Sequence, residues 1–216
     1  MSADPAFFPI MLRLADRKCL VVGAGEVAAA KIQGLLRHGA RVLVVSPRAA
    51  PSIQQQARRG TIVWRRRAFL AKDVSGAFLV IAATNSVGMN QTVFRACRKR
   101  GVLCNAVDDP QNCDFYYPAV VRRGPLQIAI STNGSSPALA ARLRRELEQQ
   151  FGPEWSHWVG HLGRMRRQLL DLELPLRTRR RRLLEMASAQ AFRSFVRQYR
   201  AAQSAMPPGG KTRRKS

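Results

Sequence analysis

Short runs of consecutive apolar residues alternate with helical patterns over the first half of the chain. The stretches between the runs place apolar residues three and four positions apart, which indicates helices at residues 26–38, 53–59 and 90–100. Runs that are apolar throughout are typical of parallel strands covered on both faces. The pattern therefore predicts an α/β fold with a doubly wound, Rossmann-like parallel sheet. Its five strands are expected at residues 18–23, 41–46, 61–64, 77–83 and 102–107, with the longest run, 77–83, in the centre.

The pattern changes after Pro110. Two apolar runs, residues 115–121 and 126–131, flank a turn sequence and predict a hairpin in a smaller sheet. Ser136 followed by proline is typical of a helix start. From residue 151 to about 203 the pattern is helical and amphipathic, with a break at Pro175.

These changes divide the chain into four expected parts. They are a sheet domain at 1–113, a small α+β segment at 114–150, a helical module at 151–205 and a basic tail at 206–216. The tail is rich in Pro, Gly, Lys and Arg, and we expect it to be disordered.

A glycine-rich turn, VVGAGEVAAAK, follows the first apolar run and opens the first helix. Gly23 allows a tight turn, Gly25 lets the backbone approach a pyrophosphate, and Ala28 permits close packing of helix and strand. The N–H groups near Glu26 and Val27, at the helix start, would face the phosphates. The motif predicts a dinucleotide site for NAD, and the alternative is a glycine turn that binds no nucleotide.

Further cofactor contacts are expected where the other strands end. The segment Ser46-Pro47-Arg48, about 20 residues after the glycines, contains no acid to hold a ribose. Ser46 can bond a ribose hydroxyl and Arg48 can reach the adenosine or a 2′-phosphate, so NAD and NADP both stay open. Thr84 is expected beside the nicotinamide, or as a hydroxyl satisfied by backbone, and Asn105 is expected to orient backbone or cofactor.

The chain carries 37 Lys and Arg against 13 Asp and Glu, a net charge of +24. Such a charge favours a polyanionic partner, either nucleic acid or a polycarboxylate, although a merely solvated Arg-rich surface is a third interpretation. An NAD-sensing module with a basic arm on nucleic acid is therefore the alternative function. No helix-turn-helix, RNP or zinc-finger signature supports it, so nucleic acid is not favoured. No apolar run approaches the roughly 20 residues of a membrane span.

Four segments together resemble the precorrin-2 dehydrogenase / sirohydrochlorin ferrochelatase family, which includes the N-terminal module of siroheme synthases. They are residues 7–31, 78–90, 103–121 and 126–148, among them AATN, NAVDDP and STNGSSPALA. The resemblance implies a homodimer with a dinucleotide-binding domain, a central dimerisation segment and a helical module. It also implies NAD-dependent oxidation of precorrin-2 to sirohydrochlorin and, in many members, insertion of ferrous iron as a second substrate.

The resemblance places the family's essential aspartate at Asp108, directly after the fifth apolar run. A carboxylate there can accept the proton released in dehydrogenation and the pyrrole protons released in metal insertion. Asp109 is the neighbouring alternative. The structural alternative for Asp108 is a turn residue before Pro110.

Precorrin-2 carries a ring of carboxylates, for which arginine is the favoured partner. The candidates are Arg122, Arg123, Arg142 and Arg145, each of which can instead be a solvated surface residue. Thr132 matches a hydroxyl residue that is phosphorylated in some siroheme synthases, or it belongs to a turn or anion-binding loop.

Two further groups of residues invite a metal or disulfide interpretation. His157 and His161 lie four residues apart, but a packing pair is favoured because no third ligand is near, and no metal site is expected. The four cysteines contain no CxxC pair and are expected to be reduced thiols of a cytoplasmic protein.

Overall fold

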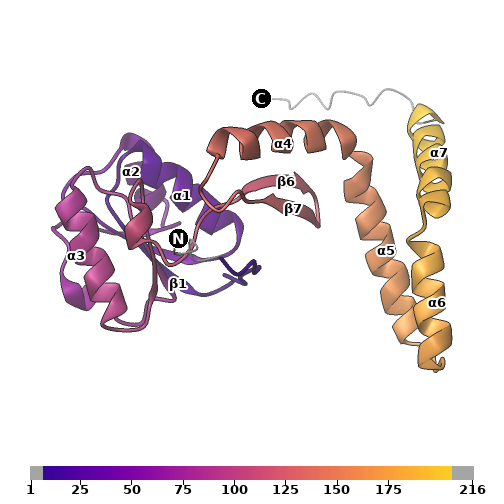
Figure 1. The fold of residues 1–216 in the computed structure, drawn as a ribbon, viewed down its shortest axis with the longest axis horizontal. Coiled ribbons are helices and arrows are strands. Elements are labelled where there is room, and N and C mark those ends of the chain that lie inside the picture. The colour runs from indigo at the N-terminus through magenta and orange to yellow at the C-terminus, as the bar shows by residue number, and fades with distance from the viewer. Residues whose placement is uncertain (1–6, 206–216) are drawn as a thin grey trace, which may run out of the picture. The chain divides into compact units, whose positions relative to one another are not determined.

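The computed structural model describes residues 7–205. The basic segment 206–216, which the sequence predicts to be disordered, lies outside the described residues. Contacts divide the described chain into two compact units, one up to Tyr117 and one from Pro118 on (Figure 1). The glycine-rich turn and Asp108 belong to the first unit, and the candidate substrate arginines belong to the second.

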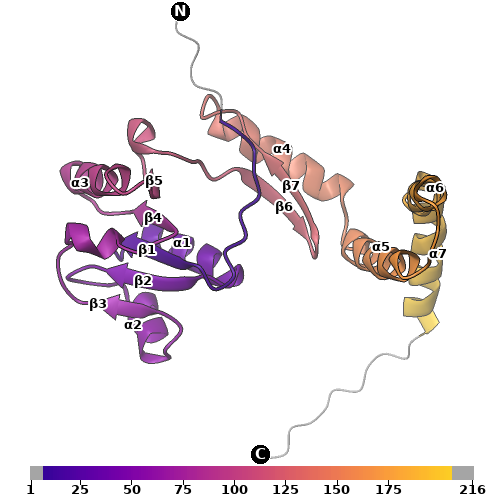
Figure 2. The ribbon, with the colours of Figure 1, turned by 90° about the horizontal axis from the view of Figure 1, so that it is seen from below.

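The first unit contains a five-stranded parallel sheet of order β3-β2-β1-β4-β5, visible in Figure 2. The strands are β1 (Lys18–Val22), β2 (Arg41–Val45), β3 (Val63–Arg65), β4 (Leu79–Ala82) and β5 (Leu103–Ala106). The prediction of a parallel sheet is confirmed, but the prediction that residues 77–83 form its centre is wrong. The chain crosses back after β3, so β4 joins the free side of β1, and β1 becomes the central strand. Residues 19–22 of β1 and all of β4 are apolar and buried because both strands are covered on two faces.

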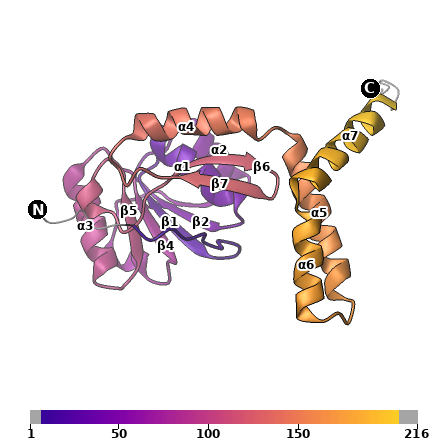
Figure 3. The ribbon, with the colours of Figure 1, turned by 45° about the vertical axis from the view of Figure 1, so that its right-hand side comes forward.

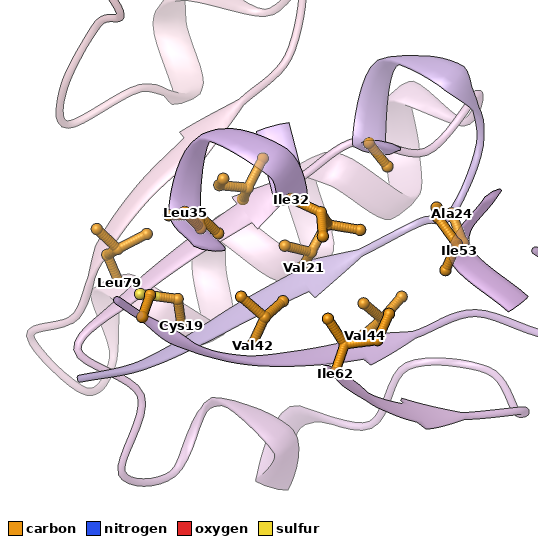
Figure 4. Close-up of a cluster of buried hydrophobic side chains, with 13 residues drawn as sticks. Cys19, Val21, Ala24, Ile32, Leu35, Val42, Val44, Ile53, Ile62 and Leu79 are labelled. Carbon is orange, nitrogen blue, oxygen red and sulfur yellow. The ribbon is translucent and has the colours of Figure 1, made fainter. Parts of the chain in front are cut away.

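Helices cover both faces of this sheet, which confirms the doubly wound fold. Helices α1 (Glu26–Arg37) and α2 (Pro51–Arg58) pack on one face around Val21, Ile32 and Ile53, as Figure 4 shows. Helix α3 (Val87–Arg98) packs on the other face. Two short 3-10 helices, η1 (Ala71–Val74) and η2 (Pro110–Asn112), complete the unit.

Three element boundaries differ from the sequence prediction for identifiable reasons. Helix α2 begins at Pro51, which suits the first helical position. Helix α3 begins three residues earlier than predicted because the Ser86 hydroxyl accepts a hydrogen bond from the Met89 N–H and caps the helix. The predicted strand 115–121 starts only at Ala119, because Phe115 packs against the core of the first unit instead.

The second unit begins with the predicted hairpin. Strands β6 (Ala119–Arg123) and β7 (Leu126–Ile130) are antiparallel, and Gly124 turns between them at φ +55°. Helix α4 (Pro137–Gln150) follows, capped by the Ser136 hydroxyl as the sequence predicts. It packs along the hairpin, as Figure 3 shows.

Three helices complete the second unit: α5 (Glu154–Leu170), α6 (Leu176–Met186) and α7 (Ala189–Ala205). The break at Pro175 was predicted, whereas the break at Ser188, whose hydroxyl accepts from the Ala191 N–H, was not. His157 and His161 lie against the rings of Tyr199 and Trp158, so both are packing residues of an aromatic cluster. Among the helices of residues 7–205, none is both long enough and apolar enough to cross a membrane.

Candidate functional site

The turn after β1 is packed tightly against the end of β4. Gly23 has φ +101°, and its N–H donates to the Val45 carbonyl at 3.0 Å. A Cβ on Gly23 would collide with the Ala83 carbonyl oxygen and would lie 2.6 Å from the Ala83 carbonyl carbon. Only glycine fits this position, as the dinucleotide fingerprint requires.

Gly25 has a different reason to be glycine. Its φ is −82°, and a Cβ there would meet no atom within 4 Å. The protein therefore leaves open space above Gly25. No side chain caps the start of α1, and Glu26 and Val27 are exposed, so backbone N–H groups are available at this helix end. The geometry fits a dinucleotide pyrophosphate.

The loop after β2 is held rigidly by Ser46. Its carbonyl accepts from Trp64 Nε1 at 3.0 Å, and its hydroxyl donates to the Arg48 carbonyl at 2.6 Å. The hydroxyl oxygen keeps acceptor capacity for a ribose hydroxyl. Pro47 and the Arg48 side chain are exposed beside it.

The hydroxyl of Thr84, two residues after the end of β4, is engaged within the protein. It lies 2.8 Å from Asn90 Oδ1 and 3.1 Å from the Ser86 carbonyl, and the Thr84 N–H also donates to Asn90 Oδ1. Asn90 is buried, and its amide nitrogen donates to the Thr84 carbonyl. Asn90 was not expected to be a site residue, although it lies in the family-like segment 78–90. Asn90 fixes the loop at the end of β4.

Asp108 lies at the carboxyl end of β5, on the same sheet edge as the glycine turn. The sheet register places β5 beside β4, and the Val107 N–H donates to the Ala82 carbonyl at 2.9 Å. Asp108 is exposed and adopts a left-handed conformation with φ +59°, which few residues other than Gly, Asn and Asp adopt. Within residues 7–205 its carboxylate has no hydrogen bond and no ion pair. It is available to a ligand.

Asn105 ties down the segment that follows Asp108. Its buried amide nitrogen donates to the Phe115 carbonyl at 2.9 Å and lies 3.3 Å from Cys113 Sγ. These contacts hold residues 113–115 against the edge of β5. Of the two roles expected for Asn105, orienting the backbone is the one for which the structure supplies partners.

Lys31 is a site residue that sequence analysis missed. It extends from α1, and its Nζ lies 3.9 Å from the centre of the Tyr117 ring. Burial lowers the pKa of Lys31, and the negative charge of Asp108 opposes that shift. Its position inside the fingerprint helix is the sequence signal that could have identified it. Lys31 supplies positive charge beside Asp108.

The candidate substrate arginines occupy different environments in the second unit. The Arg123 guanidinium donates to the carbonyls of Phe151 and Glu148 at 2.7 and 2.8 Å, so it closes the C-terminal end of α4. Arg142 is exposed and pairs with Glu146 at 3.3 Å. Arg122 and Arg145 are also exposed.

Thr132 lies in the loop that leads to α4. Its hydroxyl accepts a hydrogen bond from the Ser136 N–H at 3.1 Å. The loop residues Asn133 and Gly134 both have positive φ, +54° and +83°. The Thr132 hydroxyl therefore helps to shape the turn before the helix.

Two protein families match separate parts of the chain. Residues 10–119 match the family described as "Putative NAD(P)-binding", and residues 123–150 match "Sirohaem biosynthesis protein central". The first match covers the parallel sheet and the glycine turn. The second covers the hairpin turn, β7 and α4.

Individual relatives carry related names. The chain is 38% identical over 190 residues to siroheme synthase 1 of Serratia proteamaculans and 44% identical over 142 residues to the siroheme synthase of Methylococcus capsulatus. These matches cover 88% and 66% of this chain, which spans only 40% and 30% of those relatives.

A solved structure extends the similarity to nearly the whole fold. The structure of SirC, precorrin-2 dehydrogenase, matches with a TM-score of 0.78 at 28% identity. The match covers 92% of this chain and 98% of SirC. The chain therefore belongs to the family that contains the siroheme synthases and the precorrin-2 dehydrogenase SirC.

Proposed function

We propose that this protein is an NAD-dependent dehydrogenase that oxidises precorrin-2 to sirohydrochlorin in siroheme biosynthesis. The observation that carries the proposal is Asp108, an unengaged carboxylate in a left-handed conformation at the same sheet edge as the glycine turn. The name and fold of SirC support the same reaction.

The oxidation removes two hydrogens from the substrate, one as a hydride and one as a proton. NAD, when bound, accepts the hydride. We assign the proton to the Asp108 carboxylate, beside which Lys31 supplies positive charge. Asn105 is a positioning residue in this scheme, because it anchors the segment after Asp108.

The residues around the glycine turn fit the cofactor. The N–H groups of Glu26 and Val27, with the open space above Gly25, would hold the pyrophosphate. The Ser46-Pro47-Arg48 loop would hold the adenosine ribose. The Thr84 loop would border the nicotinamide through its backbone, since the Thr84 hydroxyl is engaged with Asn90.

We assign the substrate carboxylates to exposed arginines of the second unit, Arg122, Arg142 and Arg145, with Thr132 in the adjoining loop. Arg123 would act indirectly, by fixing the end of α4. The net charge of +24 suits a polycarboxylate substrate, so nucleic acid is not needed to account for it. The comparisons give the alternative nucleic-acid module no support.

We further propose that the protein is a homodimer and that residues 114–150 form its dimerisation segment. Within residues 118–205, the sheet of the second unit consists of the two strands β6 and β7. A hairpin needs further packing to be stable in water, and a partner surface would add to the packing that α4 supplies. Leu139 of α4 is 38% exposed beside it. The three-part division at residues 113 and 150 belongs to the same proposal.

A second activity, insertion of ferrous iron into sirohydrochlorin, is favoured by the names of the siroheme synthases. Insertion releases two pyrrole protons for each Fe²⁺, and Asp108 can accept them in turn. Iron enters this scheme as a substrate. We place both reactions in the cytoplasm, in keeping with four cysteines that form no disulfide.

The test is anaerobic incubation with NAD and enzymatically made precorrin-2, followed at 340 nm, with ferrous iron added once absorbance is constant. One NADH for each sirohydrochlorin supports the dehydrogenase, and a siroheme spectrum after iron supports the chelatase. NADH without siroheme would limit the protein to dehydrogenation. No NADH from NAD and no NADPH from NADP would overturn the enzyme proposal. DNA binding with a steep salt dependence would then support the alternative.

A further inference from the structure

A pocket of about 640 Å³ lies beside the loop that follows β2. Arg48 comes from that loop, Arg66 from the segment directly after β3, and Arg58 from the last turn of α2. The remaining lining is apolar or uncharged, contributed by Ala49, Gln54, Ala57 and Trp64. The pocket therefore carries three positive side chains and no acid.

The three guanidinium groups are not neutralised by the protein. Within the part of the chain that the structure describes, none of them has a hydrogen bond or an ion pair. The flanking residues Arg65 and Arg67, in contrast, both contact the carboxylate of Asp73. Three like charges around one concave surface favour an anionic ligand there.

The pocket wall is firmly connected to the glycine turn. The Ala50 N–H donates to the Ala24 carbonyl at 2.8 Å, and Gln54 Nε2 donates to the Ala49 carbonyl at 2.8 Å. Trp64 is fixed through its bond to the Ser46 carbonyl. The arginine-lined surface thus has a defined position relative to the site of the pyrophosphate, within one compact unit.

The residue after β2 is the one that discriminates between the two nicotinamide dinucleotides. An acid near this position bonds the ribose hydroxyls of NAD and repels a phosphate, whereas an arginine accommodates the 2′-phosphate of NADP. Here the position holds Ser46, followed two residues later by Arg48. Nothing in the pocket lining would repel a phosphate.

We infer that this pocket is a site for a phosphomonoester on the 2′ position of the adenine ribose, so that the protein binds NADP as well as NAD. Arg48 and Arg66 are the phosphate ligands, because guanidinium groups bind phosphate through paired N–H donors, and Arg58 adds to the positive field. The inference rests on the proposed dinucleotide site and specifies its ligand.

The test compares nucleotide fragments by calorimetric titration of the full chain, without any tetrapyrrole. We expect 2′,5′-ADP to bind about tenfold or more tightly than 5′-AMP. The double variant Arg48→Ser with Arg66→Ser should lose this preference. Arg59→Ser is the matched control, because Arg59 adjoins Arg58 but does not line the pocket.

Equal affinity for 2′,5′-ADP and 5′-AMP would overturn the inference, as would a preference that survives the double substitution. Binding of 3′,5′-ADP as tightly as 2′,5′-ADP would show only general attraction of anions, and would also overturn it. These outcomes are separate from the fate of the proposed reaction. A protein without the 2′ preference that still reduces NAD with precorrin-2 would refute this inference alone. A protein with the 2′ preference that reduces neither dinucleotide with precorrin-2 would refute the dehydrogenase proposal alone.

Discussion

Asn112 Nδ2 donates a hydrogen bond of 2.7 Å to Asp109 Oδ2, and this bond separates the roles of two adjacent aspartates. Asp109 stands at the N-terminal end of the short helix η2, and one oxygen of its carboxylate accepts this bond. Asp108 has no such partner among residues 7–205 and is exposed at the end of β5. Of the two aspartates, Asp108 is therefore the one whose carboxylate makes no hydrogen bond within residues 7–205.

The substitution Asp109→Asn should keep most of the rate of NADH formation. It weakens one charge-assisted hydrogen bond at a turn, so we expect a loss of about 1 kcal/mol in the free energy of unfolding. Urea unfolding and the 340 nm assay measure the two effects. An Asp109→Asn variant as inactive as Asp108→Asn would show that the assignment between the two aspartates is wrong.

The backbone conformation of Asp108 predicts a gain in stability when it is replaced by glycine. At φ +59° glycine avoids the steric cost that a Cβ causes. Asp108→Gly should therefore raise the free energy of unfolding by about 0.5–1 kcal/mol. Asp108→Val should lose stability, because a β-branched residue is strained there. Urea unfolding of both variants is the measurement. A less stable glycine variant would contradict the idea that strain is held at the site.

The two glycines of the turn should respond differently to alanine. Gly23→Ala should destabilise the fold by about 2 kcal/mol or more, because its Cβ collides with the Ala83 backbone and its φ is +101°. Gly25→Ala should fold normally, since no protein atom lies within 4 Å of its Cβ, but should bind dinucleotide more weakly.

Thermal melting and NADH fluorescence titration measure these two quantities. Gly34→Ala is a control, because Gly34 lies within α1 and its Cβ would also meet nothing within 4 Å. Equal nucleotide affinity in the Gly25 variant and the Gly34 variant would count against the proposed pyrophosphate position.

Stability should fall at low pH through Asp73. The Arg67 guanidinium, hydrogen-bonded to this buried carboxylate, holds the pKa of Asp73 below its usual value, and the Leu70 N–H adds to the shift. The unfolded chain therefore binds the proton at higher pH than the folded chain. This stabilisation is present above about pH 4, the ordinary pKa of Asp, and is lost as the pH falls through the lowered pKa.

Urea unfolding of the wild type and Asp73→Asn between about pH 3 and 6 checks this dependence. The stability difference between the two proteins should shrink as the pH falls below about 4. A difference that stays constant over this range would show that Asp73 titrates normally.

The core strands were predictable because strands buried on both faces consist of consecutive apolar residues. Runs such as residues 19–22 and 42–45 are apolar throughout, and no other environment explains them in a protein without a membrane-length apolar run. The central place of β1 was not predictable, since an apolar run of similar length fits either of two neighbouring strands. Sheet order depends on where the chain crosses back, which has no local signal.

The candidate site was predictable where a backbone constraint or a strand end marks it, as at Gly23 and Asp108. The site was not predictable where the polar atoms of a side chain bind another part of the protein. Thr84 and Arg123 resemble ligand residues in the sequence, yet their polar atoms bind Asn90 and the end of α4. Lys31 was missed because its neighbour Asp108 is 77 positions away in the sequence.

The measurement that tests the central claim most directly is the rate of NADH formation from precorrin-2 by Asp108→Asn and the wild type, at equal occupancy by NAD. Asparagine tolerates the left-handed conformation, so the variant should fold and bind NAD as the wild type does. We predict a loss of at least about a hundredfold in rate, as expected when a general base is removed. A variant with unchanged NAD affinity and a rate within a few-fold of the wild type would contradict the assignment of Asp108 as the base.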